Sequence, residues 1–159
     1  MIKIKPITLL GRLIRLEPMS EAHIPDLASV GLDPDIWRLM LYGEIQTEQD
    51  LRGWVLDILK RQSRGTDLPF VVIHHGLQRA IGATRYLNIE PAHNSLEIGG
   101  TWYGKEFQGT AVNPEAKIVI ASGYAVAGEI EQAMTSGAQA FINKPYDIQQ
   151  MLKVVREVL

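Results

Sequence analysis

The order of apolar and polar side chains predicts several elements in the first third of the chain. Segment 13–19, LIRLEPM, alternates apolar and polar residues, which is the period of a half-buried strand. Ser20 can cap a short helix that follows this strand. Segment 31–35, GLDPD, has the composition of a turn, and the apolar residues at 36–40 predict a short helical turn after it.

The clearest helical pattern begins at Thr47. Thr47 suits an N-cap position, and Asp50 stands where a capping box has its acidic partner. Gly65 is a suitable residue just past the end of this helix. Apolar residues recur at helical spacing and form one stripe: Leu51, Trp54, Val55, Ile58 and Leu59.

Three further strands are predicted at 68–75, 80–90 and 95–104. The segments between them, GLQR and PAHN, are short and rich in turn-forming residues. Connections of this length favour hairpins, so these strands are expected to form an antiparallel meander.

The pattern changes after Lys117. Residues 118–121, IVIA, form a continuous apolar run that is typical of a parallel strand covered on both faces. A helix at 129–136, a strand at 140–143 and a helix capped by Asp147 are expected next. The predicted fold class is therefore α/β: one three-layer-like domain in which parallel strand-helix-strand-helix units extend the meander. An alternative stays open, in which residues 113–122 form a helix.

Composition narrows the function classes. The chain has 159 residues, of which 46% are hydrophobic and 21% charged, as in an ordinary globular protein. It has no cysteine, which excludes disulfides and thiolate ligands, and its net charge of -2 gives no pull toward nucleic acid. No apolar run is long enough to span a membrane, so a cytoplasmic protein with no membrane or nucleic-acid partner is expected. No metal site is expected, because adjacent His74 and His75 would face opposite sides of a strand.

Two stretches of the first part resemble a known family. GRLIRLEPMSEAHIPDL near the start and LEIGGTWYGKEFQGTAVNPEAK at 96–117 are similar to the GNAT N-acetyltransferase superfamily, over residues ~10–117. The resemblance implies that acyl-coenzyme A binds at a tight turn followed by a helix. Small residues let backbone N–H groups approach a phosphate there, and Asn113 can cap the next helix. The expected phosphate-binding residues are Gln108, Gly109, Thr110, Ala111 and Asn113.

The same resemblance implies a pantetheine site and a base. The family's fourth strand offers backbone groups to the pantetheine arm, which would here involve Gly99, Gly100, Thr101 and Trp102. Glu97 is the candidate general base, acting directly or through water. One departure concerns Glu106, which places an anion where the family usually has Gln or Arg.

Residues 117–159 resemble the last part of a response-regulator receiver domain. KIVIASGYA is similar to its fourth strand, and SGAQAFINKPYDIQQMLKVVREVL to its fifth strand and last helix. Ser122 and Lys144 match the family's switch hydroxyl and lysine. The phosphoacceptor and the acidic pair for Mg²⁺ are absent, so both are interpreted as remnants without function.

These patterns lead to three hypotheses. The main one is an engineered or recombined chimera of a GNAT-like fragment, 1–116, and a receiver-like fragment, 117–159, merged in one compact domain without catalytic activity and without a required cofactor. The alternative is an acyl-CoA-dependent N-acetyltransferase that binds coenzyme A. The third is a phospho-regulated binding module. Self-association is also expected, because a truncated core leaves apolar surface uncovered.

Overall fold

The computed structural model describes residues 5–38, 40–93 and 95–122. The chain divides into compact units at residues 1–119 and 120–159, and the elements below belong to the first unit, except that the last helix runs to residue 122. Their order is β1 (Leu9–Leu10), β2 (Ile14–Pro18), the 3-10 turn η1 (Glu21–His23), α1 (Ile24–Gly31), α2 (Pro34–Trp37), α3 (Glu48–Ser63), β3 (Leu68–His74), β4 (Arg79–Glu90), β5 (Ser95–Tyr103), the 3-10 turn η2 (Lys105–Phe107) and α4 (Val112–Ser122).

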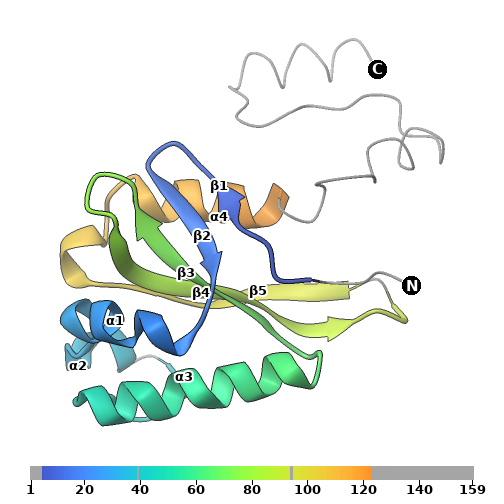
Figure 1. Ribbon diagram of the computed structural model, residues 1–159, viewed down its shortest axis with the longest axis horizontal. Coiled ribbons are helices and arrows are strands. Elements are labelled where there is room, and N and C mark those ends of the chain that lie inside the picture. Colours follow the sequence, from blue (N-terminus) through green and yellow to red (C-terminus); the bar gives the residue numbers. More distant parts are fainter. Residues whose placement is uncertain (1–4, 39, 94, 123–159) are drawn as a thin grey trace. The chain divides into compact units, whose positions relative to one another are not determined.

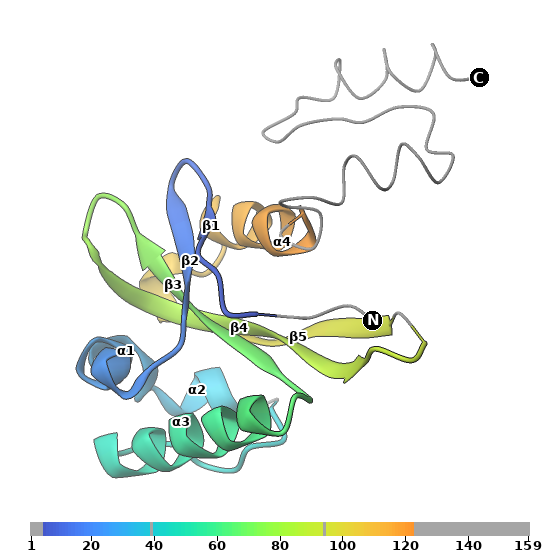
Figure 2. The same cartoon turned by 45° about the vertical axis from the view of Figure 1, so that its right-hand side comes forward.

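The five strands form one sheet in the order β1-β2-β3-β4-β5, and every neighbouring pair is antiparallel. Helices α1 and α3 lie against one face of the sheet, and α4 lies on the opposite face (Figures 1 and 2). The meander predicted for 68–104 is confirmed, as is the strand predicted at 13–19. The chain is therefore a mixed α/β protein with an antiparallel sheet.

Helix α3 forms where the pattern predicts it. The Thr47 hydroxyl accepts a hydrogen bond from Asp50 N at 3.1 Å, and Thr47 N donates to Asp50 Oδ2 at 2.9 Å, so the capping box is complete. Gly65, with φ of +78°, stands just past the helix end. Four residues of the predicted stripe are buried: Leu51, Trp54, Val55 and Ile58.

An aromatic cluster fills the space between the helices and the sheet. It joins α2, α3 and β5 through Trp37, Trp54 and Trp102, and Tyr42 packs beside them. Ring centroids lie between 5.0 and 6.3 Å apart, and the Trp37 indole N–H donates to the Gly31 carbonyl at 2.6 Å. Because aromatic side chains bury large areas, this cluster fixes the four-residue α2 against β5.

The strand predicted at 118–121 is wrong, because these residues belong to α4. Buried side chains recur at i, i+4, i+7 and i+8 (Val112, Ala116, Val119 and Ile120), whereas Ile118 is 47% exposed. The apolar run is thus one side of a helix that starts before it. The helix left open as the alternative for 113–122 is the observed structure. The other parallel units, at 129–159, lie outside the described residues.

Candidate functional site

The turn between β5 and α4 exposes its backbone. Phe107 is buried and anchors this turn, and its N–H donates to the Gly104 carbonyl at 2.9 Å. Gly109 follows in the left-handed region with φ of +72°. A Cβ built at Gly109 would meet no atom within 4 Å, so the chain is open to a ligand at this point.

Thr110 organises the first turn of α4. Its hydroxyl donates to the Phe107 carbonyl at 2.7 Å and accepts from Val112 N at 3.3 Å. The helix begins at Val112, so Asn113 is its second residue and not the predicted N-cap. Pro114 falls among the first four helical positions, where an N–H would have no intrahelical partner. The positive end of the helix dipole therefore lies beside Gly109.

Strand β5 carries a bulge at Gly100. Ala83 pairs with Trp102, whereas Arg85 pairs with Gly99, so β5 has one more residue than β4 between these pairs. Gly100 has φ of +59°. A bulge interrupts the ladder and leaves backbone groups without a partner on the neighbouring strand. These groups are available to a ligand that lies along β5.

The bulge is backed by a buried polar group. A Cβ at Gly100 would come within 3.1 Å of the Tyr42 hydroxyl and 3.2 Å of Arg85 Nε, so the position favours glycine. Arg85 Nη2 donates to the Tyr42 hydroxyl at 2.7 Å. Arg85 Nε also lies 3.1 Å from Asp67 Oδ2, and both side chains are only 6% exposed. The pair fixes the bulge from the α3 side of the sheet.

A cavity of about 280 Å³ lies where these features meet. Its walls come from α2 and the segment after it, from the end of β5, and from the turn and first residues of α4. The lining residues are Ile36, Met40, Thr101, Trp102, Tyr103, Gln108, Asn113 and Lys117.

Three buried polar atoms of residues that line the cavity have no hydrogen-bond partner within the described ranges. They are Trp102 Nε1, the Tyr103 hydroxyl and Asn113 Oδ1. Burial raises the pKa of Tyr103 to about 12, so this side chain is a neutral donor near pH 7. Buried polar groups are normally satisfied, and a bound polar ligand is one way to satisfy such a wall.

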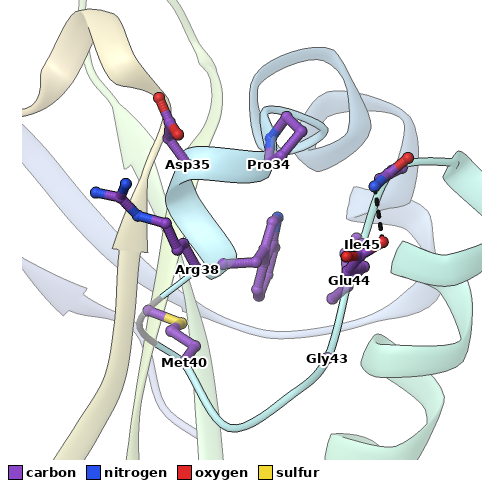
Figure 3. A pocket seen from close by; sticks show the side chains of 9 residues that line it. Pro34, Asp35, Arg38, Met40, Gly43, Glu44 and Ile45 are labelled. Carbon is purple, nitrogen blue, oxygen red and sulfur yellow. Dashed lines mark hydrogen bonds between the residues drawn. The ribbon is translucent and has the colours of Figure 1, made fainter.

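A second cavity, of about 420 Å³, lies around α2 and the segment that follows it. Figure 3 shows Asp35 and Arg38 on one side of it, and Glu44 and Ile45 on the other. Met40 lines both cavities. The two cavities therefore adjoin, with α2 between them.

Lys105 ties the η2 turn to α2. Its ammonium lies 2.7 Å from Asp35 Oδ2 and 3.0 Å from Asp33 Oδ2. The hydrogen bond to Asp35, with that to Asp33 next, raises the pKa of Lys105, and the Lys105 hydrogen bond lowers the pKa of Asp33. All three side chains are solvent-exposed, so the stabilisation is small.

Glu106 is also paired. Its Oε1 lies 3.2 Å from Arg79 Nη2, at the start of β4. Lys105 and Glu106 thus extend from η2 to different partners. The anion that the sequence places at the family's Gln or Arg position is compensated in part by Arg79.

The structure brings many of the predicted site residues together. Four of them line the smaller cavity: Thr101, Trp102, Gln108 and Asn113. The others lie in the adjoining backbone of the bulge, the turn and the helix start, namely Gly99, Gly100, Gly109, Thr110 and Ala111. Their roles stay predictions.

Three predicted residues lie elsewhere in the chain. Glu97 is exposed on β5, opposite Leu87, and is not part of either cavity lining. Ser122 is the last residue of α4. Lys144 lies outside the described residues.

Several residues of the site come from segments that are distant in sequence and were not predicted. Ile36 and Met40 reach the cavity from α2 and its connection, and Arg79 reaches Glu106 from the start of β4. Tyr103 and Lys117 line the cavity and belong to the stretch 96–117 that resembles the GNAT superfamily. Their place in that stretch was the only sequence signal for them. No sequence pattern indicated the contact between residues 79 and 106.

This arrangement belongs to a mixed α/β fold with an antiparallel sheet, and comparison with known proteins identifies the family. The acetyltransferase (GNAT) domain family matches residues 13–135, which is well over half of the chain. The chain therefore belongs to the GNAT acetyltransferase family. A comparison with curated proteins gave no significant match.

Solved structures show the same fold. An acetyltransferase structure from T. thermophilus has a TM-score of 0.65 and 27% identity, with 77% of this chain and 62% of that chain covered. A GCN5-related N-acetyltransferase from Brucella melitensis has a TM-score of 0.67 and 22% identity, over 77% of this chain and 56% of that one. The ribosomal L7/L12 alpha-N-protein acetyltransferase RimL, in complex with coenzyme A, has a TM-score of 0.64 and 20% identity, over 75% and 68%. The chain thus spans about three fifths of the length of the T. thermophilus and Brucella proteins.

The family match corrects the main hypothesis from the sequence. It runs through Lys117 to residue 135, and α4 is one helix from Val112 to Ser122. An inactive chimera of two unrelated fragments joined near Lys117 is therefore wrong. The apolar run after Lys117 suggested the break, but in the fold it continues the buried side of α4.

The residues that the structure describes contain neither a membrane-spanning helix nor a cluster of metal-binding side chains. Within residues 5–38, 40–93 and 95–122, no helix is both long and apolar enough to cross a membrane. In the same ranges, no group of three or more His, Cys, Asp or Glu side chains could hold a metal ion.

Proposed function

We propose that this chain is an acyl-coenzyme A-dependent N-acetyltransferase. The observation that carries the proposal is the open turn at Gly109, which joins the N-terminus of α4 to a cavity beside the β5 bulge. Such a turn presents backbone N–H groups to an anion, and the bulge offers backbone groups to an extended ligand arm. Both features border the same cavity.

The residues present fit the pyrophosphate part of coenzyme A. Gly109 leaves open space for close approach of a phosphate, and the helix dipole favours negative charge at the same point. Lys117 adds a cation to the cavity lining, and Gln108 and the Tyr103 hydroxyl add neutral polar groups. A cavity of about 280 Å³ accommodates only part of a coenzyme A molecule, so the remainder would extend along the surface.

The protein's contribution to this reaction is positioning. When bound, acyl-coenzyme A would supply a thioester whose carbonyl carbon a neutral amine attacks, with the C–S bond breaking and coenzyme A leaving as a thiolate that takes up a proton from solvent. Residues 99–101 would align the ligand arm, because the bulge fixes where backbone N–H and C=O groups point. Holding both reactants in place lowers the entropic part of the barrier. The hydrogen-bonded Thr84 and Thr101 hydroxyls, 2.8 Å apart, keep this segment rigid.

Proton removal from the amine is assigned to Glu97, acting through a chain of several waters, because one water cannot bridge the distance along β5. Glu97 and Thr101 are four residues apart on β5, a separation of about 13 Å in an extended strand. This distance excludes direct contact with an amine held beside the cavity. The proposal predicts that Glu97→Gln slows turnover and shifts its pH profile, with no change in coenzyme A affinity. An unchanged pH profile would remove Glu97 from the mechanism.

The acceptor is proposed to be a primary amine, such as the N-terminus of a protein. The second cavity adjoins the first and carries the carboxylate of Glu44 at its side, which attracts a cationic ammonium before it loses its proton, whereas Asp35 on the other side already pairs with Lys105. RimL, which shares the fold, acts on the N-terminus of a ribosomal protein. A peptide amine is therefore the first acceptor to test.

The test has two stages. Thermal unfolding with acetyl-coenzyme A should show stabilisation of about 2.7 kcal/mol at 100-fold over the dissociation constant. Release of free thiol is then followed with peptides that have a free or an acetylated N-terminus. Stabilisation with thiol release only for the free N-terminus supports the proposal. No stabilisation at millimolar ligand would refute donor binding, and equal release with both peptides would refute the acceptor assignment.

A further inference from the structure

We infer that Arg79 is a positioning residue for donor binding, which it supports by compensating the charge of Glu106. This inference rests on the proposed function. Glu106 is three residues before Gly109 and belongs to the turn that would receive the pyrophosphate. An uncompensated carboxylate in this turn repels a phosphate group. Arg79 Nη2 lies 3.2 Å from Glu106 Oε1 and comes from a different element, the start of β4.

Arg79 is less exposed to water than the carboxylate with which it pairs. Its Nε atom is buried, and no hydrogen-bond partner for this atom occurs among the residues that the structure describes. The Arg79 side chain is 40% exposed, whereas the Glu106 side chain is 59% exposed. The arginine stem is thus packed at the base of β4, and only its end reaches Glu106. Solvent screens the partly buried cation less, so its charge acts on Glu106 more strongly than that of a fully exposed arginine would.

The charges around η2 make this compensation necessary. Lys105 is shared between two carboxylates, Asp33 and Asp35, so this cluster has a net charge of -1. The pair of Glu106 with Arg79 is neutral. Without Arg79, the turn would carry two uncompensated negative charges, because Lys105 already has two anionic partners. Arg79 is thereby the cation that keeps the turn from repelling a pyrophosphate.

The experiment is a double-mutant cycle on the dissociation constant of coenzyme A, measured by calorimetry with the full chain at low salt. The variants are Arg79→Ala, Glu106→Gln and both together. Arg79→Ala should weaken binding about three- to tenfold, as expected for one unit charge near a dianionic group in partly screened surroundings. Glu106→Gln should leave binding unchanged or tighter. The double variant should return to within about twofold of the starting protein, because the repelling carboxylate is gone.

Arg61→Ala is the matched control. Arg61 Nε pairs with Asp57 on α3 at 3.0 Å, and its side chain is 47% exposed, so the substitution removes one cation from a comparable ion pair. It should not change the dissociation constant. The weakening caused by Arg79→Ala should shrink at high salt, because screening acts on the unpaired carboxylate.

The possible results distinguish the inference about Arg79 from the proposed function. Wild-type affinity in Arg79→Ala overturns the inference while leaving the proposed function intact. Weak binding that persists in the double variant also overturns it, since Arg79 would then contact the ligand directly or serve only the fold. Absence of any binding by the unchanged protein refutes the proposed function itself. Urea unfolding of each variant verifies that the compared proteins are folded.

Discussion

Replacing Gly109 with alanine tests whether the open turn is what binds the donor. Gly109 has φ of +72°, and a Cβ there would meet nothing within 4 Å, so the substitution introduces backbone strain without a steric clash. A left-handed conformation costs an L-residue with a Cβ about 1–2 kcal/mol. The turn either keeps its shape at this cost or relaxes, which turns its N–H groups away from the cavity.

The expected loss of coenzyme A affinity in Gly109→Ala follows from this strain. If ligand binding has to restore the left-handed conformation, up to the whole of about 1–2 kcal/mol is lost from the binding free energy, which weakens affinity by about 5- to 30-fold. Calorimetric titration with coenzyme A measures this loss directly. Urea unfolding of the same variant reports whether the strain stays in the folded state, where it lowers the free energy of unfolding by about 1 kcal/mol.

Gly65 provides a matched control. It has φ of +78°, and a Cβ there also meets nothing within 4 Å, but it stands after α3 and lines neither cavity. Gly65→Ala should lower the free energy of unfolding by a similar amount and leave the dissociation constant unchanged. Equal dissociation constants for Gly109→Ala and Gly65→Ala, together with an unchanged free energy of unfolding for Gly109→Ala, would mean that a relaxed turn still binds the donor, and would refute the assignment of the turn to phosphate binding.

Three other substitutions or conditions test the fold around the site. Asp67→Ala should destabilise the protein by about 3–5 kcal/mol in urea unfolding, because it leaves the buried Arg85 guanidinium without its anion. The lowered pKa of Asp33 makes its contribution to stability complete above the unfolded pKa, and this contribution is lost as pH falls through the folded value. The raised pKa of Lys105 acts in the opposite range, with stability lost as pH rises through its folded pKa. In pH-dependent unfolding curves, Lys105→Met should remove the effect at high pH and reduce the effect of Asp33, whose carboxylate keeps the hydrogen bond from Asp35 N. Val119→Asp should prevent stable folding, since it buries a charge under α4, whereas aspartate at an exposed position of the same helix should change stability by less than about 0.5 kcal/mol.

Local patterns predict most of the sheet and α3 correctly. The capping box at Thr47, the alternation at 13–19 and the short turns of the meander are local signals, and the structure contains each of these elements. The strand predicted for the apolar run after Lys117 is wrong, because four consecutive apolar residues suit either a buried strand or part of a helix. The helix that contains this run begins earlier, at Val112. Only the burial pattern along the helix distinguishes it from a buried strand.

Only part of the candidate site could be predicted from the sequence. The turn at Gly109 could be predicted, because small residues before a helix carry a local signal. The bulge at Gly100 could not, since it depends on how β5 pairs with Arg85 and its neighbours on β4. Arg79 and Met40 were missed because their contacts join segments that are distant in sequence. Their positions follow from the packing of whole elements, which no single window of sequence contains.

The link between Lys105 and α2 has a kinetic consequence. A helix of four residues has no stability of its own, so its position depends on its neighbours. Because Asp33 and Asp35 hold α2 to the turn next to Gly109, any shift of that turn on donor arrival would be passed to the walls of the second cavity. We therefore expect sequential addition of the two substrates, with the donor entering first and the amine finding its full binding surface only afterwards.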